Sequence, residues 1–454
     1  MKKLLLGLLF MSAIFINGTA VAQEVEATPL DTLTASVLEM KHDIDVIKRI
    51  KTSGYIQTQF QYGDSTGAAQ YNGGAFVPGD DKRFMIRRGR VKFVYDTPLN
   101  DKGISTSQFV FQVDITEKGI SMRDVYGKFT DKWIGWFSIT AGMQNNPFGF
   151  EVGYSSSSRE TPERGRMSQI LFPNERDLGA MLTIQGPKTS NWHWLKLEAG
   201  MFNGNGAPGV GGNVSDFDKM KNFIGHLTAN RSNKAETIKY GLGASYYNGG
   251  YRIDTVNVYD FSQDPSGVKG YEIAVNKNDV KPIGIGSRDY TKRNYVGFDG
   301  QLNIDWQAGL TVLRGEYIQG NQPGSATYTG SINSNTPVTT DIYNRAFNGA
   351  YFYFFQNILL SPWQLVAKYD WYDPNTEVKG DEIGKAVSGS TMKATNATDI
   401  KYSTVGVGLT YRWDSSTKLS FYYDMVTNET SNNLSGYTKD LSDNSYTLRM
   451  QVKF

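Results

Sequence analysis

The last ten residues, 445–454, constrain the fold more tightly than any other stretch of the chain. Tyr446, Leu448, Met450, Val452 and Phe454 alternate strictly with Thr447, Arg449, Gln451 and Lys453. A period of two, with apolar side chains on one face and polar ones on the other, predicts a β-strand between water and an apolar phase. That phase is either the core of a soluble sandwich or membrane lipid, and the rest of the sequence favours lipid.

The N-terminus predicts export. Lys2 and Lys3 precede an apolar run over 4–16, and Ala20-Val21-Ala22 offers a small-residue cleavage site, so we expect a signal peptide over 1–22. The run is shorter than the roughly 18 apolar residues that a membrane helix needs, and no other stretch approaches that length. A chain of this kind that enters a membrane must cross it as strands.

Composition agrees with a barrel and points to no particular partner. The chain has 48 Gly, 13% aromatic residues and a mean hydropathy of −0.42, because strands with one face to lipid and one to water average to a polar value. The absence of cysteine excludes disulfides. There are 47 basic and 45 acidic residues; loss of Lys2 and Lys3 would equalise them, and we expect no nucleic-acid partner.

Residues 23–53 are expected to form a periplasmic helical segment. Its apolar positions recur at intervals of three and four residues, and they are Leu30, Leu33, Val37, Met40, Ile44 and Ile47. This heptad spacing fits either one amphipathic helix or a short coiled coil in an oligomer. Deleting residues 24–50 would distinguish the two, because only the second should lose oligomer stability in detergent.

From residue 54 onward the period changes from helical to alternating, which predicts a transmembrane β-barrel over 54–454. We expect sixteen antiparallel strands, an even number as in closed bacterial barrels. They lie near 54–62, 84–96, 104–115, 121–130, 136–144, 178–186, 192–202, 222–230, 236–247, 292–306, 310–318, 346–356, 362–372, 401–413, 417–427 and 444–454.

The connections between these strands alternate in length, with one exception. Every second connection is short, as at 131–135 and 414–416, and the intervening ones are mostly long, as at 145–177 and 248–291. The exception is 116–120, which is short where a long loop was due. Long loops at one rim and tight turns at the other are typical of outer-membrane barrels, whereas a soluble sandwich has no reason for this regularity.

Charged residues fall on the inward positions of the predicted strands. Arg88, Arg90 and Lys92 form a cationic ladder whose intervening residues face lipid, and Arg87 breaks the alternation as a bulge or a rim residue would. Further cations expected to line the lumen are Lys128, Arg314, Lys368, Arg412 and Arg449. These side chains either solvate a water-filled interior or bind passing solutes.

The long connection over 145–177 is the expected constriction loop. Its charged residues include Arg159, Glu160, Glu163, Arg164, Arg166 and Arg176. A loop of this length is usually functional, and opposed arginines and carboxylates in a narrowed pore select solutes by electric field as well as by size. The alternative is an external loop that pairs its own charges.

The sequence gives little support for catalysis. It has three histidines, no Gly-x-Ser-x-Gly elbow and no His-Glu-x-x-His pair. The pattern Gly204-x-Gly206-x-x-Gly209 formally matches a dinucleotide fingerprint, but a Gly-rich stretch rather than a helix follows it. We therefore expect no enzyme activity, no catalytic residue, no cofactor and no metal site.

Four blocks resemble the phosphate-selective porin O and P family in its Bacteroidota form. They are 84–93 (FMIRRGRVKF), 123–129 (RDVYGKF), 141–151 (AGMQNNPFGFE) and 202–204 (FNG). The resemblance implies a sixteen-stranded trimeric barrel that passes small anions such as phosphate without chemistry. Asn145 stands where the family pattern often has lysine, which removes a cation near the expected eyelet.

We therefore expect a porin in the outer membrane of a Gram-negative bacterium, through which small hydrophilic solutes diffuse with a mild preference for anions, phosphate being one candidate. Its expected partners are outer-membrane lipid, small anionic or neutral solutes, two further copies in a homotrimer and the barrel-assembly machinery, which favours a C-terminal aromatic residue such as Phe454. The alternative is a surface-exposed structural or adhesin-type barrel without an open pore.

Overall fold

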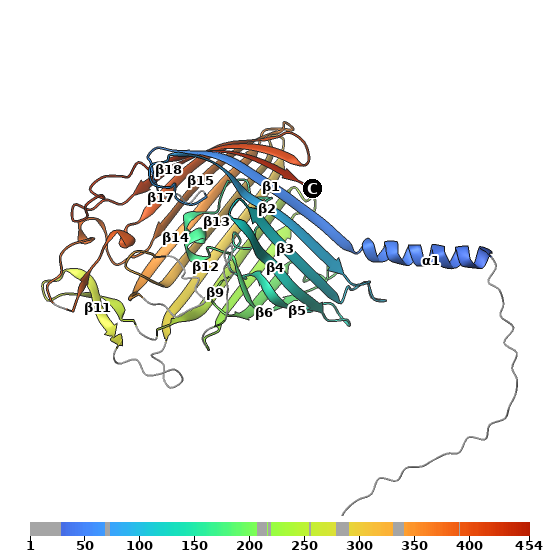
Figure 1. The fold of residues 1–454 in the computed structure, drawn as a ribbon, viewed down its shortest axis with the longest axis horizontal. Helices are drawn as coiled ribbons and strands as arrows, with labels where there is room; N and C mark the ends of the chain where they lie inside the picture. The colour runs from blue at the N-terminus through green and yellow to red at the C-terminus, as the bar shows by residue number, and fades with distance from the viewer. Residues whose placement is uncertain are drawn as a thin grey trace, which may run out of the picture. The chain divides into compact units, whose positions relative to one another are not determined.

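The computed structural model describes residues 29–68, 73–206, 216, 219–253, 256–277, 290–329, 340–389 and 391–454. The predicted signal peptide lies outside this part of the chain. The chain forms two compact units, and the boundary between them falls between Arg49 and Ile50. In the first unit, helix α1 (Pro29–Ile47) covers the predicted heptads (Figure 1). No helix among the described residues is long and apolar enough to cross a membrane.

The second unit is a closed antiparallel β-barrel. Within the described residues, sixteen strands form its wall: β1 (Ile50–Gly63), β2 (Lys82–Asp96), β3 (Ser107–Thr116), β4 (Gly119–Thr130), β5 (Phe137–Asn145), β6 (Arg176–Gln185), β7 (Leu195–Phe202), β8 (Asn222–Ser232), β9 (Ile238–Arg252), β12 (Tyr290–Trp306), β13 (Gly309–Gly324), β14 (Ile342–Asn357), β15 (Trp363–Asp373), β17 (Tyr402–Arg412), β18 (Thr417–Asn428) and β19 (Ser445–Lys453). Each predicted strand has its counterpart, so the expected fold class is confirmed. β1 begins at Ile50, before the residue at which alternation was expected to start.

The C-terminal strand closes the barrel against the first. In this antiparallel pair Ile56 lies opposite Val452 and Gln59 lies opposite Arg449. Beyond the last paired residues, the backbone N–H of Phe454 donates to the carbonyl of Gly54 at 3.0 Å. A Cβ added to Gly54 would lie 2.5 Å from the Phe454 ring. Glycine is therefore required where the terminal aromatic residue packs.

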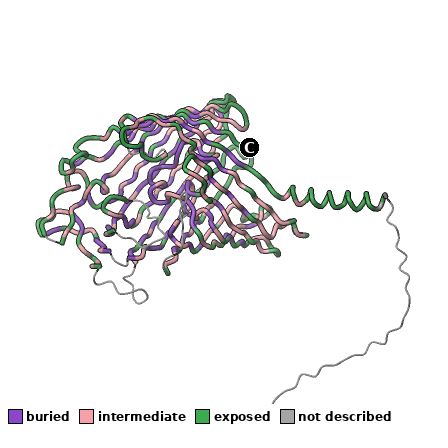
Figure 2. Tube along the Cα trace, in the orientation of Figure 1, coloured by how far each residue is buried: buried purple, intermediate pink, exposed green. Residues whose placement is uncertain are grey.

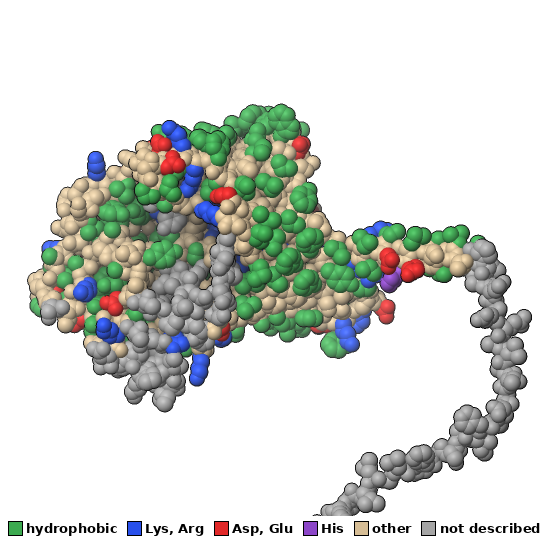
Figure 3. Space-filling view, in the orientation of Figure 1, with side chains coloured by type: hydrophobic (Ala, Val, Ile, Leu, Met, Phe, Trp, Pro, Cys, Tyr) green, Lys and Arg blue, Asp and Glu red, His purple; other side chains and the backbone are tan. Residues whose placement is uncertain are grey.

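The barrel is apolar outside, and its side chains alternate along the strands. On β19, Leu448 is 52% exposed and the adjacent Arg449 only 4%; Figure 2 shows the same alternation across the wall. Figure 3 shows apolar side chains gathered over the barrel wall. Exposed tryptophans lie near the short turns, namely Trp133, Trp192, Trp306, Trp363 and Trp413. This is the exterior of a barrel that spans an outer membrane, with aromatic residues at one interface.

Among the described residues, three further strands and two 3-10 helices lie in the long loops after β9 and β15. β10 (Val258–Gln263) and β11 (Lys269–Val275) form a hairpin between β9 and β12. β16 (Lys393–Ala394) pairs with β11, and the 3-10 helices η2 (Gly380–Glu382) and η3 (Ala397–Asp399) flank it. The sequence pattern does not predict these elements, because they are short and lie in loops where apolar residues do not recur at a regular interval.

Candidate functional site

The long connection between β5 and β6 folds into the barrel. It carries the six-residue helix α2 (Arg166–Leu171), seen in Figure 1 among the strands. On one side of the lumen its Ser156 carbonyl accepts a hydrogen bond from Gln57 of β1 at 2.9 Å. On the other side the hydroxyl of Tyr353 in β14 donates to Glu151 at 2.5 Å. The loop therefore connects two separate parts of the barrel wall, at β1 and at β14.

An apolar cluster packs inside the barrel on one side of this loop. The loop contributes Phe148, Val152, Met167, Ile170, Leu171 and Phe172. Inward residues of the wall complete the cluster, including Tyr247, Tyr295, Phe347, Tyr351, Phe355 and Tyr422. The inward charges led us to expect a wet lumen throughout. The structure instead shows a packed core along this side, because inward aromatic residues of the wall meet the apolar face of α2.

Glu163 anchors the loop to β2 and β19 through three arginines. Its carboxylate lies 2.8 Å from Arg87, 2.6 Å from Arg88 and 2.8 Å from Arg449. Burial acts to raise the pKa of Glu163, but the charges of these arginines outweigh it and hold that pKa well below its usual value. Two adjacent arginines reach one carboxylate because Arg87 forms a bulge opposite Gln57 and Thr58 of β1.

Glu175 holds the C-terminal end of the loop, directly before β6. Its carboxylate lies 3.1 Å from the Arg164 guanidinium and 3.8 Å from that of Arg159, and it also contacts Arg176. Burial raises the pKa of Glu175, yet the charges of Arg164 and Arg176 dominate and keep it well below its usual value. Arg176 in turn binds Asp124 of β4 at 2.8 Å. Buried ion pairs thus tie the loop at Glu163, within its second half, and at Glu175, at its C-terminal end.

A third ion pair fixes the middle of the loop against β13. Arg314 binds Glu160 at 2.8 Å. The Arg314 guanidinium also lies 4.6 Å from the ring centroid of Tyr154 and 5.2 Å from that of Phe150. Those two rings pack against each other with centroids 4.9 Å apart. A cation over aromatic faces holds these rings in place.

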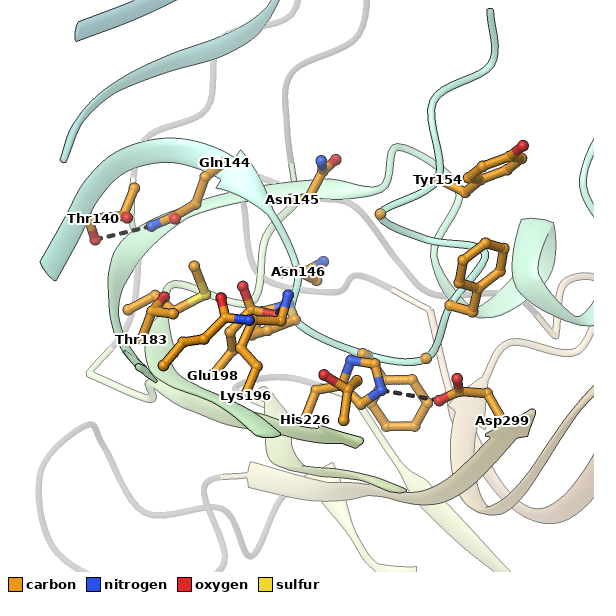
Figure 4. A pocket seen from close by; sticks show the side chains of 18 of the residues that line it. Thr140, Gln144, Asn145, Asn146, Tyr154, Thr183, Lys196, Glu198, His226 and Asp299 are labelled. Atoms are coloured by element: carbon orange, nitrogen blue, oxygen red, sulfur yellow. Dashed lines mark hydrogen bonds and ion pairs between the residues drawn. The ribbon is translucent and has the colours of Figure 1, made fainter. Parts of the chain in front are cut away.

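A polar cavity of about 600 Å³ lies on the other side of the loop. Its charged lining comprises Lys92, Asp124, Lys128, Lys196, Glu198, His226 and Asp299. Lys196 binds Glu198 at 2.8 Å, and His226 Nε2 lies 2.9 Å from Asp299 (Figure 4). Lys92 lies 4.0 Å from Asp124, whose carboxylate is already bound to Arg176. Among the described residues Lys128 has no carboxylate within ion-pair distance.

A second cavity, of about 300 Å³, adjoins the first. Its basic residues are Arg90, Lys92, Arg176 and Lys453, and its acidic residues are Asp124 and Glu175. Asn145, Gly153 and Tyr154 line both cavities. These residues therefore lie between the two spaces. Strands β2–β5 and the start of the loop border this connected polar region.

The cationic ladder divides into paired and accessible members. Arg88 is buried against Glu163, and Arg90 binds Asp114 of β3 at 3.0 Å. Lys92, with 32% of its side chain exposed, faces both cavities. The alternation correctly places all three inward, but it carries no information about the carboxylates that neutralise the first two.

The other predicted site residues lie in several environments. Lys368 binds Asp370 at 3.1 Å and Asp424 at 2.9 Å in the buried interior. Arg412 is exposed at the end of β17. The Arg166 guanidinium lies 4.3 Å from the Tyr402 ring centroid. Arg449, expected to line the lumen, is buried and contacts the loop at Glu163 and Pro162.

Several cavity residues were not among the predicted site residues. Gln144, Asn146, Tyr154 and His226 line the larger cavity. The alternation of β5 and β8 could have identified Gln144 and His226 as inward. Asn146 and Tyr154 belong to the loop, whose course no local period reveals. Within the described residues no group of three or more histidine and acidic side chains could hold a metal ion.

These features define a closed barrel of the porin type, with a long loop folded into its lumen beside a polar cavity. A structure comparison finds the anion-selective porin from Comamonas acidovorans, at 11% identity and a TM-score of 0.50, covering 89% of this chain and 99% of that one. The outer membrane channel DcaP of Acinetobacter baumannii matches at 11% identity and a TM-score of 0.49, covering 89% and 97%. No family model and no curated sequence matches the chain. The likeness concerns the fold.

Proposed function

We propose that the protein is an outer-membrane porin for passive diffusion of small hydrophilic solutes. The observation that carries this proposal is the polar cavity of about 600 Å³ inside a closed barrel, beside a loop fixed by buried ion pairs. A rigid constriction within a polar lumen sorts solutes by size and charge and needs no chemistry. We accordingly propose a channel and not an enzyme.

A mild anion preference is the second part of the proposal, with phosphate among the candidate anions. Its support is the imbalance of accessible charge: Lys128 has no carboxylate partner among the described residues, and Lys92 shares Asp124 with Arg176. Lys453 adds another cation at the smaller cavity. The field along the polar region is therefore weakly positive.

Planar-bilayer recordings test both parts. We expect ohmic channels and, in a salt gradient, a reversal potential on the anion side. Lys128→Gln should reduce the anion-to-cation permeability ratio roughly fivefold, since one charge a few ångströms away in water is worth about 1 kcal/mol and about 1.4 kcal/mol is a factor of ten. Lys132→Gln, at an exposed turn residue, is the matched control. An absence of channels would end the porin proposal, whereas a cation-side potential would end the anion preference alone.

We also propose a homotrimer assembled partly through α1. The heptad positions Leu30, Leu33, Val37, Met40, Ile44 and Ile47 are all exposed in the described structure. Isoleucine at both core positions of the last heptad, Ile44 and Ile47, favours more than two strands in a parallel coiled coil. Asp43 and Lys48 occupy flanking positions from which neighbouring copies can pair. Deletion of residues 24–50 should lower the temperature at which the oligomer dissociates in detergent.

An adhesin-type surface barrel is the second candidate, favoured by the structured long loops. β10, β11, β16 and η3 form their own buried network there, in which Arg345 binds Asp399 at 2.9 Å. Ordered outer loops can present a binding surface. Impermeability to small solutes in reconstituted vesicles, together with ligand binding that depends on these loops, would favour this candidate.

A further inference from the structure

The larger cavity carries a set of neutral hydrogen-bonding groups that charge selection leaves unused. They come from the adjacent strands β5 and β6 and from the start of the loop, and they are Thr140, Gln144, Asn145, Asn146, Thr183 and Gln185. Figure 4 shows most of these side chains around the same space, with Thr183 beside Glu198, its cross-strand neighbour on β7. A purely electrostatic filter does not require so many amides and hydroxyls in one wall.

Gln144 is held in a fixed orientation. Its side chain is 3% exposed, and its Nε2 donates to the carbonyl of Thr140 at 3.1 Å and to that of Gly179 at 3.4 Å. Its Oε1 has no hydrogen-bond partner in the protein. A buried acceptor without a partner is costly unless water or a ligand supplies a donor. Gln144 is therefore a pre-oriented acceptor at the cavity wall.

The next two residues extend this acceptor surface. The side-chain oxygens of Asn145 and Asn146 are likewise buried and have no protein partner. The backbone N–H of Asn146 donates to the carbonyl of Glu175 at 3.0 Å, which fixes the chain at this point. Three consecutive amides thus border the cavity. An anion without hydroxyl groups cannot satisfy these acceptors, whereas a polyol can.

Two pairs of charges in the cavity wall neutralise each other, whereas Lys128, the cross-strand neighbour of Thr140, is not paired with a carboxylate among the described residues. The Lys196–Glu198 pair, at 2.8 Å, and the His226–Asp299 pair, at 2.9 Å, present donors and acceptors side by side. A hydroxyl group both donates and accepts, so it can bind such a pair at little electrostatic cost. This part of the wall is consequently suited to neutral hydroxylated solutes.

Aromatic rings complete the site. Phe150 and Tyr154 both line the larger cavity, and Tyr154 also lines the smaller one. A solute that passes between the two cavities therefore moves along the Tyr154 ring, which Arg314 holds in position. The C–H face of a sugar ring is apolar and can contact an aromatic face while its hydroxyls meet the amides.

We propose that this cavity is a binding site for a neutral polyhydroxylated solute, of the size of a mono- or disaccharide. Gln144, Asn146 and the Lys196–Glu198 pair bind its hydroxyls, and Tyr154 contacts its apolar face. A volume of about 600 Å³ is within the range of small-molecule sites. The inference rests on the proposed porin function and specifies its solute class.

The test is block of ion current through the full-length protein in a planar bilayer, with maltose and sucrose as probes. Polyethylene glycol of similar mass is the size control, because its ether oxygens accept but its interior carries no donors. We expect saturable block by at least one disaccharide and none by the polymer at equal concentration. Gln144→Ala and Tyr154→Ala should each raise the half-blocking concentration about tenfold, as expected when one hydrogen bond or ring contact is lost.

Gln319→Ala is the matched control, since this amide is exposed on β13 and lines neither cavity. We expect it to leave block unchanged. Conducting channels that disaccharides do not block, or block no better than the polymer, would overturn the sugar site but leave the porin intact. Block by phosphate that exceeds sugar block and is insensitive to Gln144→Ala would also overturn it.

An absence of channels would defeat the porin proposal itself. In that case titration calorimetry of the detergent-solubilised protein with maltose and sucrose decides the site independently. Heat of binding that Gln144→Ala abolishes would support the site, and an absence of binding heat for both sugars would reject it. Retention of the heat-resistant folded band on gels establishes that each variant still forms the barrel.

Discussion

The two sides of the barrel interior are built from the same alternating strands but differ in chemistry. Near the short turns of β2–β8, inward positions hold amides, hydroxyls and paired charges around an open cavity. Against β13–β18, and at the long-loop ends of β7–β12, inward positions hold aromatic and aliphatic residues packed on α2. The apolar side thus fixes the position of the loop, and that position leaves the polar side open.

Polar groups on the apolar side are placed to satisfy the loop. The hydroxyl of Tyr353 donates to Glu151 at 2.5 Å, and that of Tyr351 donates to Glu316 at 2.8 Å. Glu151 also accepts from the backbone N–H of Gly165 at 3.0 Å. Tyrosine suits this role because it fills space and still provides a donor. Structural tyrosines and solute-facing tyrosines therefore occur in one lumen and differ in what they contact.

Removing the charge that anchors the loop should have the largest effect. In Glu163→Gln, three arginines, Arg87, Arg88 and Arg449, lose their common carboxylate. Breaking a buried pair typically costs about 3–5 kcal/mol. We expect the loop to detach from β2 and β19, so that single-channel conductance rises and size selection weakens.

Asp101→Asn, at an exposed turn residue, is the control for this change of charge. It should leave conductance and thermal stability as they are. If Glu163→Gln conducted like the unmodified protein and unfolded at the same temperature, the loop would be held by the apolar core alone, and the ion pairs would be incidental to its position.

Truncating the apolar side should destabilise more than truncating the polar side. Leu171 is fully buried in the aromatic cluster, so Leu171→Ala should cost about 2–5 kcal/mol. Gln301→Ala, at the cavity wall, should change stability by less than about 0.5 kcal/mol, because water replaces the lost amide. Urea unfolding in detergent measures both, and equal losses would contradict the division of the lumen.

The barrel could be predicted from the sequence because strand alternation is local, but the division of its lumen could not. Inward positions such as Tyr351 and Tyr353 follow from a period of two. Whether an inward residue meets water or the loop depends on a segment some 180 or more residues away. The partnership of Arg88 with Glu163, across 75 residues, is equally non-local. The pattern therefore identified the face of each residue but not its environment.

The ladder residues should separate in a selectivity measurement. Lys92 faces both cavities, so Lys92→Gln should lower the anion-to-cation permeability ratio roughly fivefold. Arg90→Gln should lower thermal stability and change that ratio less, because Arg90 borders the smaller cavity but is buried against Asp114, which also pairs with Arg123. Reversal potentials for the two variants provide the comparison. A larger selectivity shift from Arg90 than from Lys92 would reverse the assignment.

The smallest effect is expected from mild acid. Because the pKa of Glu163 in the folded protein lies well below its unfolded value of 4.5, its contribution to stability is complete above about pH 4.5. It is lost only as the pH falls from there through the folded-state pKa, and the same sign applies to Glu175. Single-channel conductance should therefore stay constant between pH 7 and pH 5. The measurement uses a His226→Gln variant, which has no imidazole in the cavity. A reversible rise in its conductance near pH 6 would contradict the expectation, because Glu163 and Glu175 would then take up protons well above pH 4.5 despite their arginine partners.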